Sequence, residues 1–185
     1  MCKYALKQSV FVLEAAPSFS FYCPFRAPVK CAMMKGEWKR SVKHVNQPRT
    51  PRRLVVKVGT STLTRATGSL NLQNMEPLAR VLADLAGMGY QPVLVSSGAI
   101  GIGTKKLRLG ERPTELRMKQ AAAAVGQCRM MHIYDKLFAE YNRTVAQILL
   151  TGEDVESPVR SEHLHNTFEA LLELGVIPVV NENDS

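Results

Sequence analysis

Two hydrophobic periods alternate along the chain from residue 53 onward. Short apolar runs rich in β-branched residues predict buried strands, whereas apolar residues that recur every three or four positions predict amphipathic helices. Glycine and proline residues separate these segments and set their ends. The predicted strands cover residues 54–58, 92–96, 144–150 and 176–180. The predicted helices cover residues 75–85, 98–107, 114–141 and 164–172.

This alternation of strands and helices predicts the α/β class. Strands that are joined through helices pair in parallel, and right-handed crossovers leave few topologies. We therefore expect a three-layer α/β/α sandwich with a mostly parallel sheet. The polar stretches 62–71 and 152–158 are expected to be loops. No apolar run reaches the roughly 20 residues that a membrane-spanning helix needs, so we expect a soluble protein without a membrane partner.

Residues 1–52 lack both periods and carry the charge excess of the chain. The sequence of 185 residues has 24 Lys and Arg against 16 Asp and Glu. Ten of these basic residues and two of the acidic ones precede residue 53, so the remaining part is neutral. We expect a disordered or targeting leader at 1–52 and one globular unit at 53–185. A neutral globular unit does not favour a nucleic-acid partner.

The leader leaves two compartments open. Its residues 29–32, VKCA, resemble the processing motif of plastid transit peptides, which would place the protein in the plastid stroma. A true start at Met33 or Met34, or a plain basic tail, is the alternative and fits a cytoplasmic protein. Three of the four cysteines lie in this leader without C-x-x-C spacing. We therefore predict neither a disulfide framework nor a zinc site, and we assign no metal ligand.

Three of the predicted strands end in short polar segments, at residues 59–61, 96–98 and 181–184. In open parallel sheets, ligands bind beyond the carboxyl ends of the strands. Glycine and small hydroxyl residues at such ends expose backbone N–H groups that can hold phosphate or carboxylate. Lys57 lies inside the first of these strands, where a buried ammonium needs an anion unless the side chain reaches solvent from the strand end. These features predict an anion site.

Several segments together resemble the N-terminal half of the glutamate 5-kinases, also called γ-glutamyl kinases, a group within the amino acid kinase family. The similarity runs from about residue 53 to residue 185 and implies the amino acid kinase-like fold. The resemblance is specific because several segments match together, whereas each segment alone would be a weaker indication of the family. The segments are KVGTSTLT at 57–64, SSGAIGIG at 96–103, KQAAAAVGQ at 119–127, ILLT at 148–151 and VIPVVNEND at 176–184.

The resemblance implies a reaction and a set of roles. ATP, with Mg²⁺, would phosphorylate the side-chain carboxylate of L-glutamate to L-glutamyl 5-phosphate, the first step of proline biosynthesis. Lys57 would be the catalytic lysine that contacts the ATP phosphates. Backbone N–H groups at the two glycine loops suit binding of phosphate and of carboxylate. The expected phosphate-binding residues are Lys57, Gly59, Thr60 and Ser61, and the expected glutamate-binding residues are Ser97, Gly98, Ala99, Asn181 and Asp184.

These roles require Lys57, Ser97 and Asp184 to face one shared anion pocket. Phosphoryl transfer between two anions demands alignment and neutralisation of charge, and Lys57 would supply the positive charge. Asp184 would receive the α-ammonium of glutamate, and Ser97 would hydrogen-bond a substrate carboxylate. The structural alternatives are a solvated loop carboxylate for Asp184 and a helix N-cap for Ser97. His163 and His165 are expected at the surface, because residues two apart on a helix point to different faces.

The sequence departs from the family in two places. Gly152 stands where an arginine is common, and residues 160–164 read RSEHL where relatives carry an Arg-Tyr-x-Asn-Ala stretch. This bears on glutamate affinity and on feedback by proline. The chain also stops before the nucleotide-binding half, so we expect a fragment that does not catalyse alone and a homo-oligomer when full length. The alternatives are a non-catalytic glutamate- or proline-binding module and another member of the amino acid kinase family.

Overall fold

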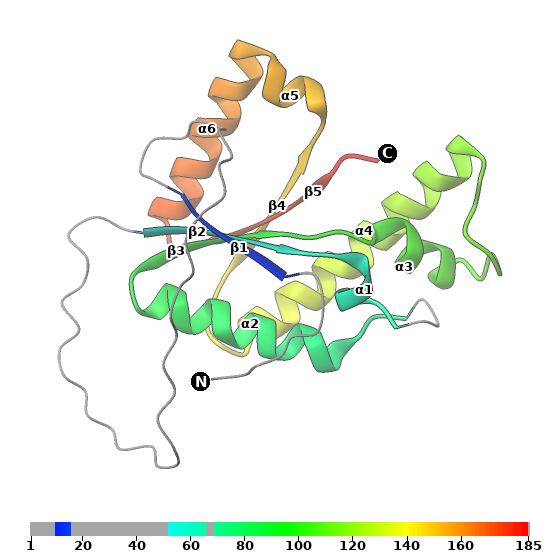
Figure 1. Ribbon diagram of the computed structural model, residues 1–185, viewed down its shortest axis with the longest axis horizontal. Helices are drawn as coiled ribbons and strands as arrows, with labels where there is room; N and C mark the ends of the chain where they lie inside the picture. Colours follow the sequence, from blue (N-terminus) through cyan, green and yellow to red (C-terminus); the bar gives the residue numbers. More distant parts are fainter. Residues whose placement is uncertain (1–9, 16–51, 66–68, 185) are drawn as a thin grey trace.

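The computed structural model describes residues 10–15, 52–65 and 69–184. Its centre is a five-stranded sheet in the order β1-β2-β3-β5-β4 (Figure 1). Four of the strands run parallel: β2 (Arg52–Val58), β3 (Tyr90–Val95), β5 (Ile177–Glu182) and β4 (Val145–Leu150). β1 (Val10–Ala15) pairs antiparallel with the outer side of β2. The predicted α/β class with a mostly parallel sheet is confirmed.

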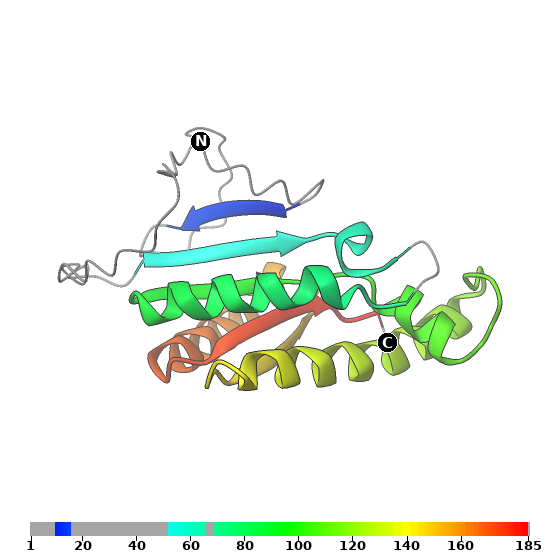
Figure 2. The same ribbon diagram turned by 90° about the horizontal axis from the view of Figure 1, so that it is seen from below.

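Helices cover both faces of this sheet, as the sequence predicts (Figure 2). One face packs against α2 (Leu72–Gly87) and α4 (Leu116–Ala139). The other face packs against α6 (Pro158–Glu173). Successive side chains of a strand point to opposite faces, so β2 contributes Val56 and Val58 to the first core and Val55 to the second. No helix in the described residues is long and apolar enough to cross a membrane.

Three elements lie where the sequence shows no pattern for them. β1 falls inside the segment 1–52 that we expected to be a disordered or targeting leader; the rest of that segment up to residue 51 is outside the described residues. The helices α1 (Thr60–Leu63) and α5 (Gly152–Glu156) replace parts of the two predicted loops. Both have five residues or fewer, and such short helices cannot display an amphipathic period.

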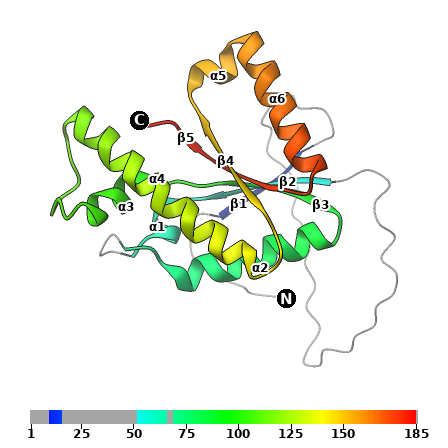
Figure 3. The same cartoon turned by 180° about the vertical axis from the view of Figure 1, so that it is seen from behind.

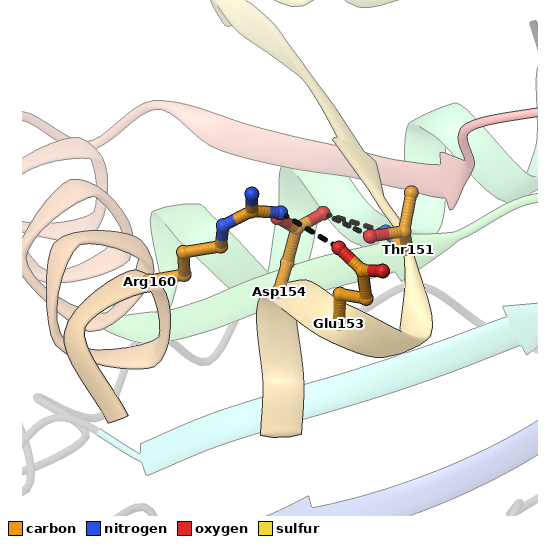
Figure 4. A network of polar contacts seen from close by, with 4 residues as sticks. All are labelled: Thr151, Glu153, Asp154 and Arg160. Atoms are coloured by element: carbon orange, nitrogen blue, oxygen red, sulfur yellow. Dashed lines mark hydrogen bonds and ion pairs between the residues drawn. The ribbon is translucent and has the colours of Figure 1, made fainter. Parts of the chain in front are cut away.

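The corner between α5 and α6 is held by polar contacts (Figure 4). The Asp154 carboxylate accepts hydrogen bonds from the Thr151 N–H at 2.8 Å and from the Thr151 hydroxyl at 2.7 Å. Arg160 reaches back from α6 to Glu153 at 3.3 Å and to Asp154 at 3.4 Å. The Thr151 hydrogen bonds, and then the Arg160 charge, lower the pKa of Asp154. These contacts lie in the segment where we expected the sequence to depart from the family that it resembles.

The helices α3 (Ala99–Lys106) and α4 touch backbone to backbone through two glycines. A Cβ on Gly103 would lie 1.7 Å from the Ala122 carbonyl oxygen, and one on Gly126 would lie 1.8 Å from the Ala99 carbonyl oxygen. Only glycine allows backbones to approach this closely. Because Ala99 is the first residue of α3, this contact fixes where that helix begins beside α4.

Candidate functional site

The carboxyl ends of the four parallel strands meet at one edge of the sheet. The register of β3 and β5 brings the Ser96 N–H within 2.8 Å of the Val180 carbonyl. On the far side of β5, the Asn183 N–H donates to the Leu150 carbonyl of β4 at 2.8 Å. Figure 3 shows the outer strand β4 leading from α4 into α5 at this edge. The segments predicted to form the site therefore lie at one rim, where ligands of parallel sheets bind.

The loop after β3 lies against the loop after β2. The Ser97 hydroxyl donates to the Val58 carbonyl at 3.0 Å and lies 3.5 Å from the Thr60 hydroxyl. Gly98 has a φ of +99°, which is the left-handed region that favours glycine, and it is the N-cap residue of α3. Ser97 is therefore not the N-cap, and that structural alternative is wrong. Because the Ser97 hydroxyl has a single proton, it must rotate away from Val58 before it can donate to a ligand.

Buried groups under the rim hold this loop in place. The Ser96 hydroxyl lies 3.0 Å from the Tyr134 hydroxyl and 3.3 Å from the Met130 sulfur, both on α4. Burial raises the pKa of Tyr134 well above its ordinary value, against the smaller opposing effect of its Ser96 hydrogen bond. Tyr134 therefore stays a neutral hydroxyl. Sequence analysis did not assign Tyr134, which lies within the helix predicted over residues 114–141.

A cleft of about 210 Å³ opens at the ends of β4 and β5, on the face of the sheet that α4 covers. Ala99 and Asp184, two of the residues expected to bind glutamate, are both in its lining. Asp184 follows the end of β5 and is of intermediate exposure. The lining residues are Ala99, Ala123, Ala124, Gln127, Cys128, Gln147, Leu149, Glu182, Asn183 and Asp184.

The cleft has a polar wall with a definite chemical character. The acidic residues Glu182 and Asp184 are in the lining together with the amide residues Gln127, Gln147 and Asn183, and no Lys or Arg belongs to the described lining. Carboxylates accept hydrogen bonds from an ammonium, and amide N–H groups donate to a carboxylate. The first N–H groups of α3, beginning at Ala99, have no intrahelical acceptor and point out of the helix start. The wall therefore suits a small zwitterion that carries both an ammonium and a carboxylate.

Asn181 lies at the end of β5 and beneath this cleft. It is 7% exposed, and its Nδ2 donates to Gln127 Oε1 at 2.7 Å. Its Cα partner in β4 is Leu149, which lines the cleft. Sequence analysis did not assign Gln127, although this residue ends the quoted segment 119–127. Nothing in the helical period could have distinguished it, since the pattern registers only apolar positions.

The structure does not bring Lys57 into the cleft. Lys57 is exposed and lies between Val56 and Val58, whose side chains enter the α4-side core. Alternation therefore directs Lys57 to the face that α6 covers, together with its neighbour Val95. Ser97 is not in the lining either. The expectation of one shared pocket for Lys57, Ser97 and Asp184 is therefore not met, because only Asp184 of the three lines the cleft. Ala99 lines it with Asp184, whereas Ser97 lies beside Thr60.

The predicted phosphate-binding segment follows Lys57 directly. Gly59 is the N-cap residue of α1, and Thr60 and Ser61 form its exposed first turn. Their N–H groups have no intrahelical acceptor. His163 and His165 are exposed on α6, as expected. Within the described ranges there is no group of three His, Cys, Asp or Glu side chains that could hold a metal ion.

Comparisons with known proteins agree with this fold. The model of the amino acid kinase family matches residues 52–185. A glutamate 5-kinase of Clostridium perfringens is 57% identical over 134 residues, which cover 72% of this chain and 50% of that protein. One of Clostridium acetobutylicum is 57% identical over 133 residues, with the same coverage, and one of Listeria monocytogenes is 53% identical over 134 residues.

This architecture defines a class of proteins: parallel α/β proteins with a cleft at the carboxyl ends of the strands. The chain belongs to the amino acid kinase family. The resemblance stated from the sequence is confirmed at this level. The chain spans about half the length of the relatives it matches.

Proposed function

We propose that this chain is the glutamate-binding part of a glutamate 5-kinase. The single observation that carries the proposal is that Ala99 and Asp184 line one cleft at the carboxyl edge of the sheet. The relatives that are 52–57% identical over this region are named glutamate 5-kinases. Their reaction, phosphorylation of the side-chain carboxylate of L-glutamate by ATP to give L-glutamyl 5-phosphate for proline synthesis, is the activity we assign to the whole protein.

In this proposal the cleft orients the acceptor. The Asp184 carboxylate receives the α-ammonium of glutamate. The N–H of Ala99 donates to a substrate carboxylate at the start of α3. Ser97 donates to the same end of the substrate after its hydroxyl turns from Val58. Asn181 supports the floor of the cleft through its bond to Gln127.

The donor end of the reaction is assigned to the end of β2, which is separated from β5 by β3. Lys57 contributes a positive charge for the ATP phosphates, and the N–H groups of Gly59, Thr60 and Ser61 bind phosphate oxygens. Mg²⁺ would accompany ATP and neutralise phosphate charge; it is usually held by one or two carboxylates plus the phosphates themselves. We assign no residue of this chain as its ligand.

Isothermal titration tests the acceptor site. L-glutamate added to the chain should give a saturable binding heat, and Asp184→Asn should weaken the affinity about 10- to 100-fold, since a charge-assisted hydrogen bond contributes about 1.5–3 kcal/mol. Glu173→Gln is the matched control, because Glu173 is an exposed residue at the end of α6 and makes the same change of charge. Equal weakening by both variants, or no weakening by either, would refute the assignment of Asp184.

A further inference from the structure

One side chain in the wall of the cleft has an unused hydrogen-bond donor. Gln127 is 7% exposed, so more than nine-tenths of it is buried. Its Oε1 accepts the hydrogen bond from Asn181, whereas its Nε2 has no hydrogen-bond partner among the described residues. A buried donor without an acceptor is destabilising. Such groups are rare in folded proteins, and each calls for an explanation, of which a bound ligand is one.

The orientation of the Gln127 amide is determined by its neighbour. Asn181 presents an amide nitrogen to Gln127 at 2.7 Å, and a nitrogen donor needs an oxygen opposite it. Oε1 must therefore face Asn181, which leaves the Nε2 end as the free one. Asn181 is itself 7% exposed at the end of a central strand, so it cannot move aside easily. The pair holds one donor in a fixed direction.

The residue that carries this donor is in the lining of the cleft. Gln127 lines it from α4 together with Ala123 and Ala124, whose side chains are small. The acidic residues Glu182 and Asp184 belong to the same lining. A ligand that satisfies both sides needs a cationic nitrogen toward the carboxylates and an anionic or carbonyl oxygen toward Gln127. Amino acids have this pair of groups.

We propose that Gln127 is a substrate-positioning residue whose Nε2 donates a hydrogen bond to a carboxylate oxygen of the amino-acid substrate in this cleft. The proposal rests on the proposed function of the cleft and adds a specificity residue to it. Asn181 then acts through Gln127, because it fixes the amide orientation. Asp184 and Gln127 together define the two ends of the substrate.

The test is glutamate binding by two variants of the same residue. Gln127→Glu keeps an oxygen for Asn181 but removes the donor, and Gln127→Met keeps the length of the side chain without either polar atom. Both should weaken L-glutamate affinity in isothermal titration by about 10- to 100-fold, the range for a hydrogen bond to a charged group. Gln120→Glu is the control: Gln120 is exposed on the same helix and should bind as the wild type does.

A second measurement needs no variant at position 127. In a ¹⁵N spectrum of the chain, the side-chain amide signals of Gln127 should shift on addition of L-glutamate, and those of Gln120 should not. A wild-type chain that binds glutamate with unmoved Gln127 signals, or Gln127 variants that bind with wild-type affinity, would overturn this inference and leave the proposed function intact. A wild-type chain with no glutamate binding at all would overturn both.

Discussion

At the scale of single residues, glycine determines how the candidate site is built. Gly98 provides the left-handed turn that starts α3, and Gly126 allows α4 to lie against the carbonyl of Ala99. Ala99 lines the cleft, so the packing of the α3 and α4 backbones also sets the position of the Ala99 N–H. A side chain at Gly126 would therefore disturb both stability and binding.

Gly126→Ala should destabilise the fold. The new Cβ would lie 1.8 Å from the Ala99 carbonyl oxygen and 2.8 Å from the Gly103 nitrogen, so two helix backbones would have to separate. Overpacking of this kind costs about 1–3 kcal/mol, and more where backbone must move. Urea unfolding followed by circular dichroism measures the change. An unfolding midpoint equal to that of the wild type would show that α3 and α4 are not in contact here.

Gly101→Ala provides the matched control. Gly101 lies in the same helix α3, and no atom lies within 4 Å of the position its Cβ would take. Replacing glycine by alanine inside a helix stabilises by about 0.5–1 kcal/mol where the space allows it. The two substitutions should therefore shift the free energy of unfolding in opposite directions.

The residue scale also shows where sequence reasoning ended. The rim position of Ser97 and Asp184 followed from strand ends alone, because ligand sites of parallel sheets lie there. Which face a side chain takes depends on the register of its strand, and register is not visible in a single sequence. Lys57 of β2 and Asn181 of β5 lie in strands that both pair with β3, but they belong to opposite faces of the sheet. Gln127 was missed since its partner lies 54 residues away in the chain.

At the scale of elements, the hydrophobic period predicted the longer helices and the parallel strands, but it did not predict the short helices α1 and α5. The strands β2 to β5 and the helices α2, α3, α4 and α6 were all expected from their apolar positions. α5 depends instead on Thr151 and Asp154 at its start and on Pro158 at the start of α6. β1 depends on pairing with β2, a tertiary contact with no local signal. The hydrophobic period carries no information on local polar contacts or on the pairing of strands that are distant in the sequence.

The contribution of Asp154 to stability should depend on pH. Its pKa is lowered in the folded state, first by its hydrogen bonds to Thr151 and then by the Arg160 charge. A lowered folded-state pKa means that the unfolded chain binds protons more readily, so the stabilisation is present above the unfolded pKa of about 3.9 and is lost as pH falls through the folded pKa. Asp154→Asn should thus lower the free energy of unfolding at pH 7 and have a shrinking effect below pH ~4.

Urea unfolding of wild type and Asp154→Asn at a series of pH values checks this dependence. Glu156→Gln is the control, because Glu156 is an exposed carboxylate at the opposite end of the same short helix. The helix dipole disfavours a negative charge at that end, so its removal should not destabilise. A difference between wild type and Asp154→Asn that stays constant from pH 7 to pH 3 would contradict the role of the ionised carboxylate.

At the scale of the whole molecule, the two faces of the sheet are packed unequally. Among the described residues, the core under α2 and α4 includes large fully buried side chains such as Tyr134, Phe138 and Met130. The core under α6 is smaller and is centred on Phe168 and Leu172. The α6 layer therefore depends more on its polar link to the sheet. That link joins Arg53 of β2 to Glu169 of α6.

Removing this link should loosen the α6 layer. The Arg53 side chain is 11% exposed, and its guanidinium donates to Glu169 and, at 3.3 Å, to Gln91. Glu169→Ala would leave a largely buried positive charge without its carboxylate, at a cost of about 1–3 kcal/mol. Glu173→Ala, one turn further along α6 and exposed, should cost little. Urea unfolding measures both changes in the free energy of unfolding.

A double variant separates the ion pair from the simple loss of a side chain. Arg53→Met with Glu169→Leu replaces both charges by apolar groups, and such replacements of buried pairs are often neutral or stabilising. The double variant should therefore recover most of the stability that Glu169→Ala loses. It should do so while glutamate affinity stays unchanged, because neither residue lines the cleft. If the double variant is as unstable as Glu169→Ala, the α6 layer is held by the shape of these two side chains and not by the compensation of the Arg53 charge.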